Sequence, residues 1–224
     1  MPEANSTSEP FRSDSATPAV RGFLHRPAKP NGDVLVLSHG AGSNANASLL
    51  IALAETLCAQ GFFVLRCDLP YRQSRSYGPP GPGDAARDRA GLKNAIAAVS
   101  EFAQGRIFLG GHSYGGRQSS MLCAEEPGVA HGLLLMSYPL HPPRKPEQLR
   151  TQHFPQLQTP ALFIHGTRDP FASSEEIQKA LEWIPAKIKL VEFEGAGHDL
   201  GFEKKSASRE LPEKIAGVFR EFFG

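Results

Sequence analysis

One feature constrains the fold of this chain more than any other: short apolar runs alternate along it with stretches of helical periodicity. Residues 34–37 (Val-Leu-Val-Leu) form a continuous apolar run, as expected of a strand covered on both faces. Apolar residues then recur at helical spacing over 50–57. The same alternation predicts further strands at 62–65, 107–109, 132–137, 161–165 and 187–193, and further helices at 92–99, 115–125, 177–184 and 211–222. This order predicts an α/β fold, with a doubly wound, mostly parallel sheet of about seven strands flanked by helices.

The pattern begins only after the first 18 residues. Residues 1–18 are dominated by Ser, Thr, Pro, Asn, Asp and Glu, and Phe11 is their only large apolar side chain besides Met1. Such a segment buries too little surface to offset its ordering entropy, so we expect a flexible tail. Residues 19–224 show no internal repeat and no linker, which predicts one domain. The interval 138–160 is too short for a separate lid domain, so we expect an open site.

The overall charge excludes some classes of partner. Lys plus Arg number 24 and Asp plus Glu 23, which gives a net charge of +1 and no support for nucleic-acid binding or an electrostatic hold on membranes. No apolar run approaches the ~20 residues that span a bilayer. The three cysteines lie in apolar surroundings without a CxxC pair, which favours reduced thiols over disulfides or zinc. We therefore expect a cytoplasmic protein without metal or cofactor.

The candidate nucleophile is Ser113. It is the centre of the motif G-x-S-x-G at residues 111–115, which follows the apolar run 107–109 and opens a helical stretch. This strand–elbow–helix setting is the one that the motif requires. The glycines two positions before and after the serine remove Cβ atoms that would clash where helix and strand pack closely.

A serine hydroxyl needs a base to take its proton, and His198 is the candidate. It ends the segment Gly-Ala-Gly-His at 195–198, just after the last expected strand. A buried carboxylate can fix the tautomer of such a histidine. Asp169 is the candidate for that acid, because it follows the strand at 161–165 and precedes His198 in the order Ser…Asp…His. Asp68, which also follows a strand, is the reserve acid, whereas Asp199 is too close to His198 in sequence to reach back to its ring.

The turn at residues 39–42 (His-Gly-Ala-Gly) follows the first buried strand, where this scheme places part of an oxyanion hole. The expected donors are the backbone N–H groups of Ala41 and Tyr114, and we expect His39 to be structural.

The loop 69–83 follows a strand at the edge where open α/β sheets bind ligands. Arg72 and Arg75 in this loop, together with Arg117 after the elbow, are candidates to hold a carboxylate or phosphate of the substrate. The alternative is that they are solvated loop arginines. His141 is a further candidate to line the pocket from the opposite side.

Four segments carry a resemblance to a known family: the turn at 39–42, the elbow at 111–115, and the segments 165–169 (His-Gly-Thr-Arg-Asp) and 195–198. Together, and in this order, they resemble the α/β-hydrolase superfamily over roughly residues 19–224. The small size and the missing lid resemble the uncapped group that includes dienelactone-hydrolase-like proteins. Residues 68–72 (Asp-Leu-Pro-Tyr-Arg) and 110–117 are also similar to the testis-expressed and histone-acetylation-complex hydrolase-like proteins. Ser113 stands where dienelactone hydrolases have cysteine and where dehalogenases and epoxide hydrolases have aspartate, so the resemblance implies none of those three activities.

The sequence therefore predicts a serine hydrolase that cleaves a carboxylic ester or thioester of a small molecule through an acyl-enzyme. The alternative is a protein of this fold that binds partners and turns over little or nothing, since fold does not fix function. A peptidase has no positive feature in the sequence. The acyl and alcohol groups and the oligomeric state are not encoded in any recognisable pattern.

Overall fold

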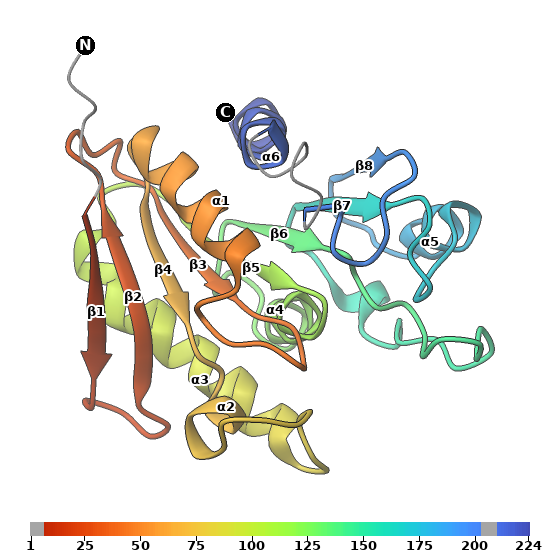
Figure 1. Ribbon diagram of the computed structural model, residues 1–224, viewed down its shortest axis with the longest axis horizontal. Helices are drawn as coiled ribbons and strands as arrows, with labels where there is room; N and C mark the ends of the chain where they lie inside the picture. Colours follow the sequence, from red (N-terminus) through yellow and green to blue (C-terminus); the bar gives the residue numbers. More distant parts are fainter. Residues whose placement is uncertain (1–6, 203–209) are drawn as a thin grey trace.

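Eight strands form one continuous sheet in the computed structural model, which describes residues 7–202 and 210–224 (Figure 1). The order across the sheet is β1-β2-β4-β3-β5-β6-β7-β8. The strands are β1 (Thr7–Ser13), β2 (Val20–Arg26), β3 (Val34–Ser38), β4 (Phe63–Cys67), β5 (Ile107–His112), β6 (Gly132–Met136), β7 (Ala161–Gly166) and β8 (Ile188–Phe193). Strands from β4 to β8 run parallel, while β1 and β2 are antiparallel to their neighbours. The prediction of a mostly parallel sheet is confirmed.

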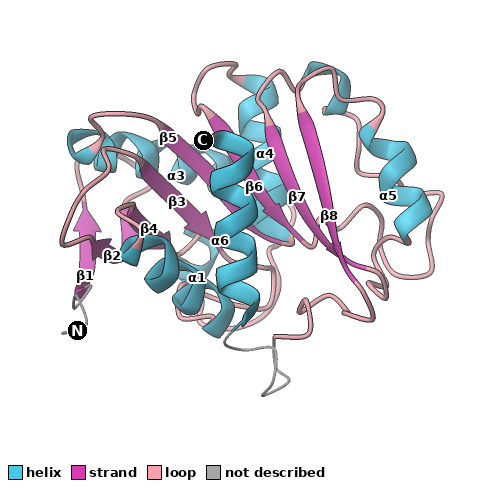
Figure 2. Ribbon diagram, turned by 90° about the horizontal axis from the view of Figure 1, so that it is seen from above, coloured by secondary structure: helices cyan, strands magenta, loops and turns pink. Residues whose placement is uncertain are grey.

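Helices cover both faces of this sheet. They are α1 (Ser48–Ala59), α2 (Pro70–Ser74), α3 (Asp84–Val99), α4 (Tyr114–Glu125), α5 (Ser174–Leu181) and α6 (Glu210–Phe223). Buried side chains of α1 and α6 share one core cluster, and those of α3, α4 and α5 share the other. Figure 2 shows α1 and α6 lying together over one face of the sheet. The fold is thus doubly wound, as the sequence predicts.

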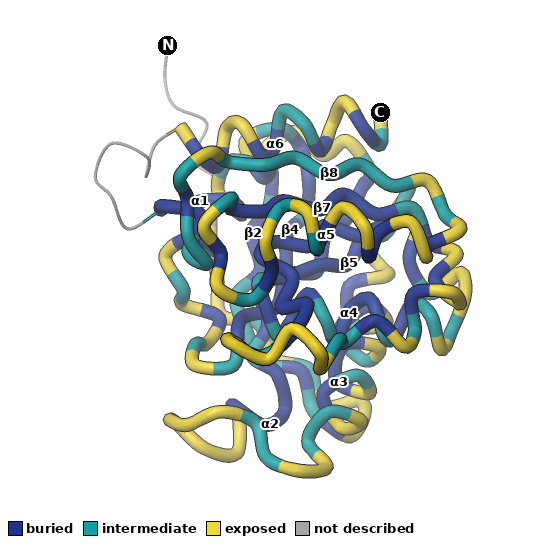
Figure 3. Tube along the Cα trace, turned by 90° about the vertical axis from the view of Figure 1, so that its right-hand side faces the viewer, coloured by how far each residue is buried: buried dark blue, intermediate teal, exposed yellow. Residues whose placement is uncertain are grey.

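The two cores explain why the central strands are apolar throughout. Along β3, Val34 and Val36 face the α3–α4 side, while Leu35 and Leu37 face the α1–α6 side. All five residues of β3 are buried, because alternate side chains of a strand enter opposite faces and both faces are covered. The burial colouring shows the same buried centre (Figure 3). The carboxyl ends of β3, β5, β7 and β8 therefore meet at one edge, held by a rigid core.

The expected flexible tail is wrong for the residues that the structure describes. β1 pairs with β2 along its whole length, from Thr7 opposite Arg26 to Ser13 opposite Val20. It is the outermost strand: its side chains Ser8, Glu9 and Arg12 are exposed, and backbone hydrogen bonds to β2 hold it. An ion pair joins Glu9 to Arg26 at 2.6 Å, and Phe11 packs against the core. β1 is an additional strand at the sheet edge. Residues 1–6 of the predicted tail lie outside the described residues.

No lid domain is inserted between β6 and β7, as expected from the sequence. Residues 137–160 form a loop whose one helical element is the 3-10 turn Phe154–Gln156. In the described parts of the chain, no helix is both long enough and apolar enough to cross a membrane. Residues 137–160 therefore add no separate domain at the carboxyl edge of the sheet.

Candidate active site

Ser113 lies in the sharp turn between β5 and α4. Its backbone has φ 52° and ψ −115°, a conformation that residues with side chains rarely adopt. The neighbouring glycines make the turn possible, because a Cβ on Gly111 would lie 2.4 Å from the Ser38 carbonyl oxygen. A Cβ on Gly115 would lie 2.5 Å from the Ser38 hydroxyl and 2.6 Å from the His39 carbonyl oxygen. The close contact of the elbow with β3 is what the two glycines allow.

The structure brings Ser113, His198 and Asp169 into one hydrogen-bonded row. His198 Nε2 is 2.8 Å from Ser113 Oγ, and His198 Nδ1 is 2.8 Å from Asp169 Oδ2. The Asp169 side chain is fully buried, and its Oδ1 accepts a hydrogen bond from the Phe171 N–H at 2.9 Å. The Phe171 ring lies 4.2 Å from the His198 ring, centre to centre. A carboxylate fixed in this way holds the His198 proton on Nδ1 and leaves Nε2 free to accept from the serine.

His112 ties the histidine loop to the elbow, although the sequence analysis did not single it out. Its Nε2 lies 2.8 Å from the His198 carbonyl oxygen, and the two rings are 5.1 Å apart. Burial, followed by the nearby His198 ring, lowers the pKa of His112 to about 4. His112 is therefore neutral near pH 7 and donates from Nε2. Because it is the variable residue before the motif serine, the motif itself gave no signal for this contact.

The other acids considered from the sequence lie elsewhere. Asp68 Oδ1 accepts from the Ala45 N–H at 2.7 Å and is 3.7 Å from His39 Nε2. Asp199 Oδ1 accepts from the Gly201 N–H at 3.0 Å. Both carboxylates thus stabilise turns, and the ring of His198 faces Asp169.

The turn after β3 is held by hydrogen bonds to the carbonyl oxygen of Gly40. The Gly40 carbonyl oxygen accepts from the Tyr71 hydroxyl at 3.1 Å and from His39 Nδ1 at 2.9 Å. The peptide is planar and trans, so the Ala41 N–H points away from these donors. Tyr114 is the first residue of α4, so its N–H has no partner within the helix. Both expected oxyanion donors are consequently backbone groups beside Ser113.

A buried aspartate links the two sides of this arrangement. Asp88 Oδ1 accepts from the Tyr71 N–H at 3.0 Å, and Asp88 Oδ2 accepts from the Tyr114 hydroxyl at 2.8 Å. Burial raises the pKa of Asp88. The sequence carried a signal for it, since Asp88 lies at helical spacing from the apolar positions Leu92, Ala95 and Val99 of α3.

Two of the three arginines expected to contact substrate have other partners. Arg72 is buried, and its guanidinium donates to the carbonyl oxygens of Ser43 at 2.7 Å, Gly78 at 2.9 Å and Ala41 at 3.3 Å. Arg75 forms an ion pair with Asp84. The structure corrects the prediction for both, because the short helix α2 directs Arg72 toward the turn after β3 and Arg75 toward Asp84.

The sequence matches the family described as alpha/beta hydrolase domain over residues 31–222. The chain belongs to this family. Membership in this family confirms the prediction that the protein is a hydrolase.

Solved structures show the same fold at low identity. A dienelactone hydrolase from Anabaena variabilis superposes with a TM-score of 0.76 at 19% identity, covering 97% of this chain and 98% of that one. An alpha-beta serine hydrolase homologue from Coxiella burnetii gives 0.75 at 19% identity, with 96% and 98% covered. A serine hydrolase without lid from Xanthomonas campestris gives 0.68 at 16% identity, with 98% of each chain covered. The resemblance to small uncapped α/β hydrolases is confirmed at the level of the fold.

A cavity of about 290 Å³ opens beside Ser113 in this hydrolase. Its lining includes Ala41, Tyr114 and Phe171, which belong to the arrangement described above. Arg117, a candidate from the sequence, lines this cavity, and so does Arg150 from the loop after β6. The sequence gave no signal for Arg150, because its loop has neither a motif nor a period. The volume is at the lower end of the range for small-molecule sites, about 300–1,000 Å³.

His141 does not line this cavity, contrary to the sequence-based expectation. It is buried, with Nδ1 2.8 Å from the Pro142 carbonyl oxygen and Nε2 3.4 Å from Glu176 Oε2. Two prolines after the histidine fold its ring back onto its own loop and toward α5.

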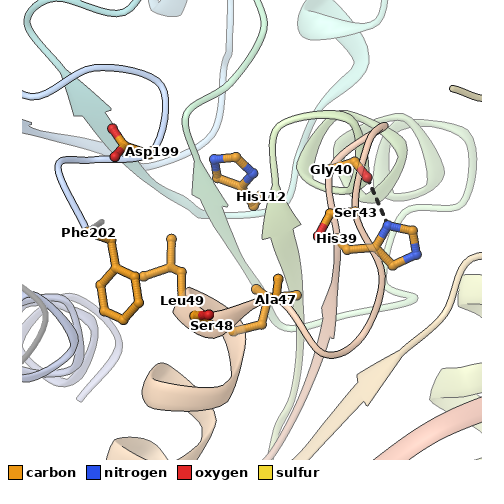
Figure 4. Close-up of a pocket in the computed structure, with 10 residues that line it drawn as sticks. His39, Gly40, Ser43, Ala47, Ser48, Leu49, His112, Asp199 and Phe202 are labelled. Carbon is orange, nitrogen blue, oxygen red and sulfur yellow. Dashed lines mark hydrogen bonds between the residues drawn. The ribbon is translucent and has the colours of Figure 1, made fainter. Parts of the chain in front are cut away.

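A second cavity, also of about 290 Å³, lies along α1 and borders His112 (Figure 4). Its wall is largely apolar, with Leu49 and Phe202 side by side in the view, and it also contains Gly40 and Asp199. The two cavities differ in character, because the first contains two arginines and the second contains none.

Among residues 7–202 and 210–224, no three His, Cys, Asp or Glu side chains gather to hold a metal ion. Burial raises the pKa of Cys67 and of Cys123 to about 12, so both remain thiols at neutral pH.

Proposed function

We propose that this α/β hydrolase is a serine esterase or thioesterase that acts on small molecules and works through an acyl-enzyme. The observation that supports it is the hydrogen-bonded row Ser113–His198–Asp169 at a strained elbow beside an open cavity. Buried thiols in Cys67 and Cys123 favour the cytoplasm as its location.

In the proposed mechanism, Ser113 Oγ attacks the carbonyl carbon of the substrate while His198 Nε2 takes the hydroxyl proton. Asp169 stabilises the imidazolium through the Nδ1 proton. The negative charge that forms on the carbonyl oxygen is held by the N–H groups of Ala41 and Tyr114; a donor of this kind is typically worth a factor of about 10²–10³ in rate. His198 then gives its proton to the departing alcohol or thiol. Water, deprotonated by the same histidine, releases the acid and restores the serine.

A fluorophosphonate probe tests the nucleophile, because it phosphonylates an activated serine hydroxyl and spares inert ones. We expect labelling at Ser113 in the parent and none in Ser113→Ala, with hydrolysis of p-nitrophenyl butyrate reduced by at least about 10³-fold. Ser119→Ala is a matched control: this serine is also buried on α4, but its hydroxyl only donates to carbonyl oxygens. It should still be labelled. A folded parent protein that takes no label and cleaves no ester would contradict the proposal and favour a partner-binding role.

A further inference from the structure

The cavity beside Ser113 is positively charged on one side. Arg117 is on the first turn of α4, and Arg150 comes from the loop between β6 and β7. Arg150 is held at its backbone, since its N–H donates to Leu140 at 2.8 Å and its carbonyl oxygen accepts from the Tyr138 hydroxyl at 2.7 Å. Two elements far apart in the sequence thus bring two guanidinium groups to one cavity.

Neither arginine has an acidic partner among residues 7–202 and 210–224. In the described part of the chain neither Arg117 nor Arg150 forms an ion pair, and the buried Arg117 Nε has no hydrogen-bond partner. Arg150 Nη1 donates to the Pro139 carbonyl oxygen at 3.3 Å. By contrast, nearby Arg89 pairs with Glu125 at 2.8 Å. A partly desolvated guanidinium without an ion-pair partner is unfavourable, and an anion bound in the cavity would stabilise it.

The neighbouring His153 does not offset the positive charge of the two arginines. Burial, then the charges of Arg117 and Arg89, lowers the pKa of His153 to about 4, so the ring is neutral. His153 Nε2 is engaged with the Ser120 hydroxyl at 2.8 Å. Burial, then the charge of Arg117, also lowers the pKa of Arg150. The two arginines therefore affect one another, as expected of like charges that share a space.

We propose that Arg117 and Arg150 form an anion subsite, and that the preferred substrates of this hydrolase carry a carboxylate close to the ester bond. The proposal rests on the proposed function. Arg117 follows Ser113 by one helical turn, which places the two Cα atoms about 6 Å apart along the helix axis. The carboxylate is thus separated from the scissile carbonyl by a short chain. Guanidinium groups suit it because they bind both carboxylate oxygens at once.

Two pairs of esters test the subsite and locate the charge. In the acyl pair, p-nitrophenyl hexanoate is compared with the mono-p-nitrophenyl ester of adipic acid. In the alcohol pair, butyl butyrate is compared with the butyrate ester of 4-hydroxybutanoate. We expect kcat/KM to be higher for the charged ester by about tenfold or more in one pair. Preference in either pair supports the subsite and shows which side of the ester faces the arginines.

The variants separate binding of the anion from general damage. Arg117→Ala and Arg150→Ala should each lower kcat/KM for the preferred charged ester by about tenfold or more, and change the neutral ester by less than about threefold. Arg75→Ala is the matched control, because its guanidinium is paired with Asp84 outside the cavity. It should change neither. Equal losses on charged and neutral esters, or no preference in either pair, would overturn the subsite.

Binding without turnover keeps this proposal distinct from the proposed function. Ser113→Ala retains both arginines, so it should bind adipate, measured calorimetrically, and the double variant Ser113→Ala, Arg150→Ala should bind it at least about tenfold more weakly. If Ser113 takes no fluorophosphonate but adipate binding follows Arg150, the nucleophile is wrong and the subsite stands. If Ser113 is labelled but adipate does not bind, the subsite is wrong and the nucleophile stands.

Discussion

Replacing Tyr71 by phenylalanine should slow the chemical step without touching any group that contacts the substrate. The Tyr71 hydroxyl lies 3.1 Å from the Gly40 carbonyl oxygen and 2.8 Å from the Ala41 carbonyl oxygen, and the residue is fully buried. These carbonyls belong to the turn that presents the Ala41 N–H. Tyr71 is therefore a positioning residue for the proposed oxyanion hole, and Tyr71→Phe removes its hydroxyl while keeping the ring.

The magnitude follows from what remains in place. The Gly40 carbonyl oxygen keeps His39 Nδ1 at 2.9 Å, and the Ala41 carbonyl oxygen keeps Arg72 Nη2 at 3.3 Å. No acceptor is left without a donor, so the unfolding free energy should fall by only about 1 kcal/mol, the net value of one neutral hydrogen bond. Complete loss of an oxyanion donor costs about 10²–10³ in kcat. A donor that is loosened but present should cost about tenfold, or about 1.4 kcal/mol of barrier.

Steady-state kinetics on p-nitrophenyl butyrate and urea unfolding check both numbers. We expect kcat to fall with KM nearly unchanged, because the stabilisation is lost in the transition state. Tyr138→Phe is the matched control: this tyrosine is also buried, and its hydroxyl donates to a carbonyl, that of Arg150, outside the oxyanion turn. It should lower stability by at least as much and leave kcat for the neutral ester alone. An unchanged kcat in Tyr71→Phe, or an equal fall of kcat in Tyr71→Phe and Tyr138→Phe, would refute this reasoning.

Two further predictions concern the acid and the pH dependence of stability. Asp169→Asn should lower kcat by about three to four orders of magnitude, because it permits the wrong histidine tautomer. Asp68→Asn should lower kcat by less than about tenfold, because an amide oxygen still accepts from the Ala45 N–H. Comparable losses of kcat in the two variants would mean that the acid is misassigned. Burial is the main cause that lowers the pKa to about 4 in three histidines, His25, His112 and His153. Between pH 4 and about 6.5 the unfolded chain binds more protons at these sites. The unfolding free energy should therefore decrease as pH falls through this window, by up to about 1.4 kcal/mol per pH unit for each histidine; denaturation curves that coincide at pH 7 and pH 5 would contradict the prediction.

The central strands of the sheet were predictable because they are buried on both faces, and the helices because their buried residues recur at helical spacing. In β3 and β6 every residue is buried, so the apolar runs mark these strands within a residue or two. β1 gave no such signal. It is an edge strand held by backbone pairing and exposed ion pairs, which a polar sequence supplies as well as an apolar one.

The candidate site divides in a similar way. Ser113, Asp169 and His198 follow strands directly, so their positions at the carboxyl edge follow from the topology. The contacts of Arg72 and Arg150 depend on how the segment carrying α2 and the loop after β6 fold back toward that edge. Neither periodicity nor motif encodes such a path. His112 illustrates a third case, in which a residue beside a motif gains its partner, the His198 carbonyl, only when two distant loops meet.

The left-handed backbone of Ser113 has a consequence for how the protein tolerates change. A side chain in such a conformation costs of order 1–3 kcal/mol, whereas glycine adopts it without steric conflict. The fold alone would thus favour glycine at the one position where the proposed chemistry requires a hydroxyl. The pairing of β5 with β3 and β6 has to offset that cost. A destabilising substitution in the middle of the sheet therefore acts on a free energy of unfolding that Ser113 has already lowered. Variants with glycine at position 113 should tolerate more substitutions in their core.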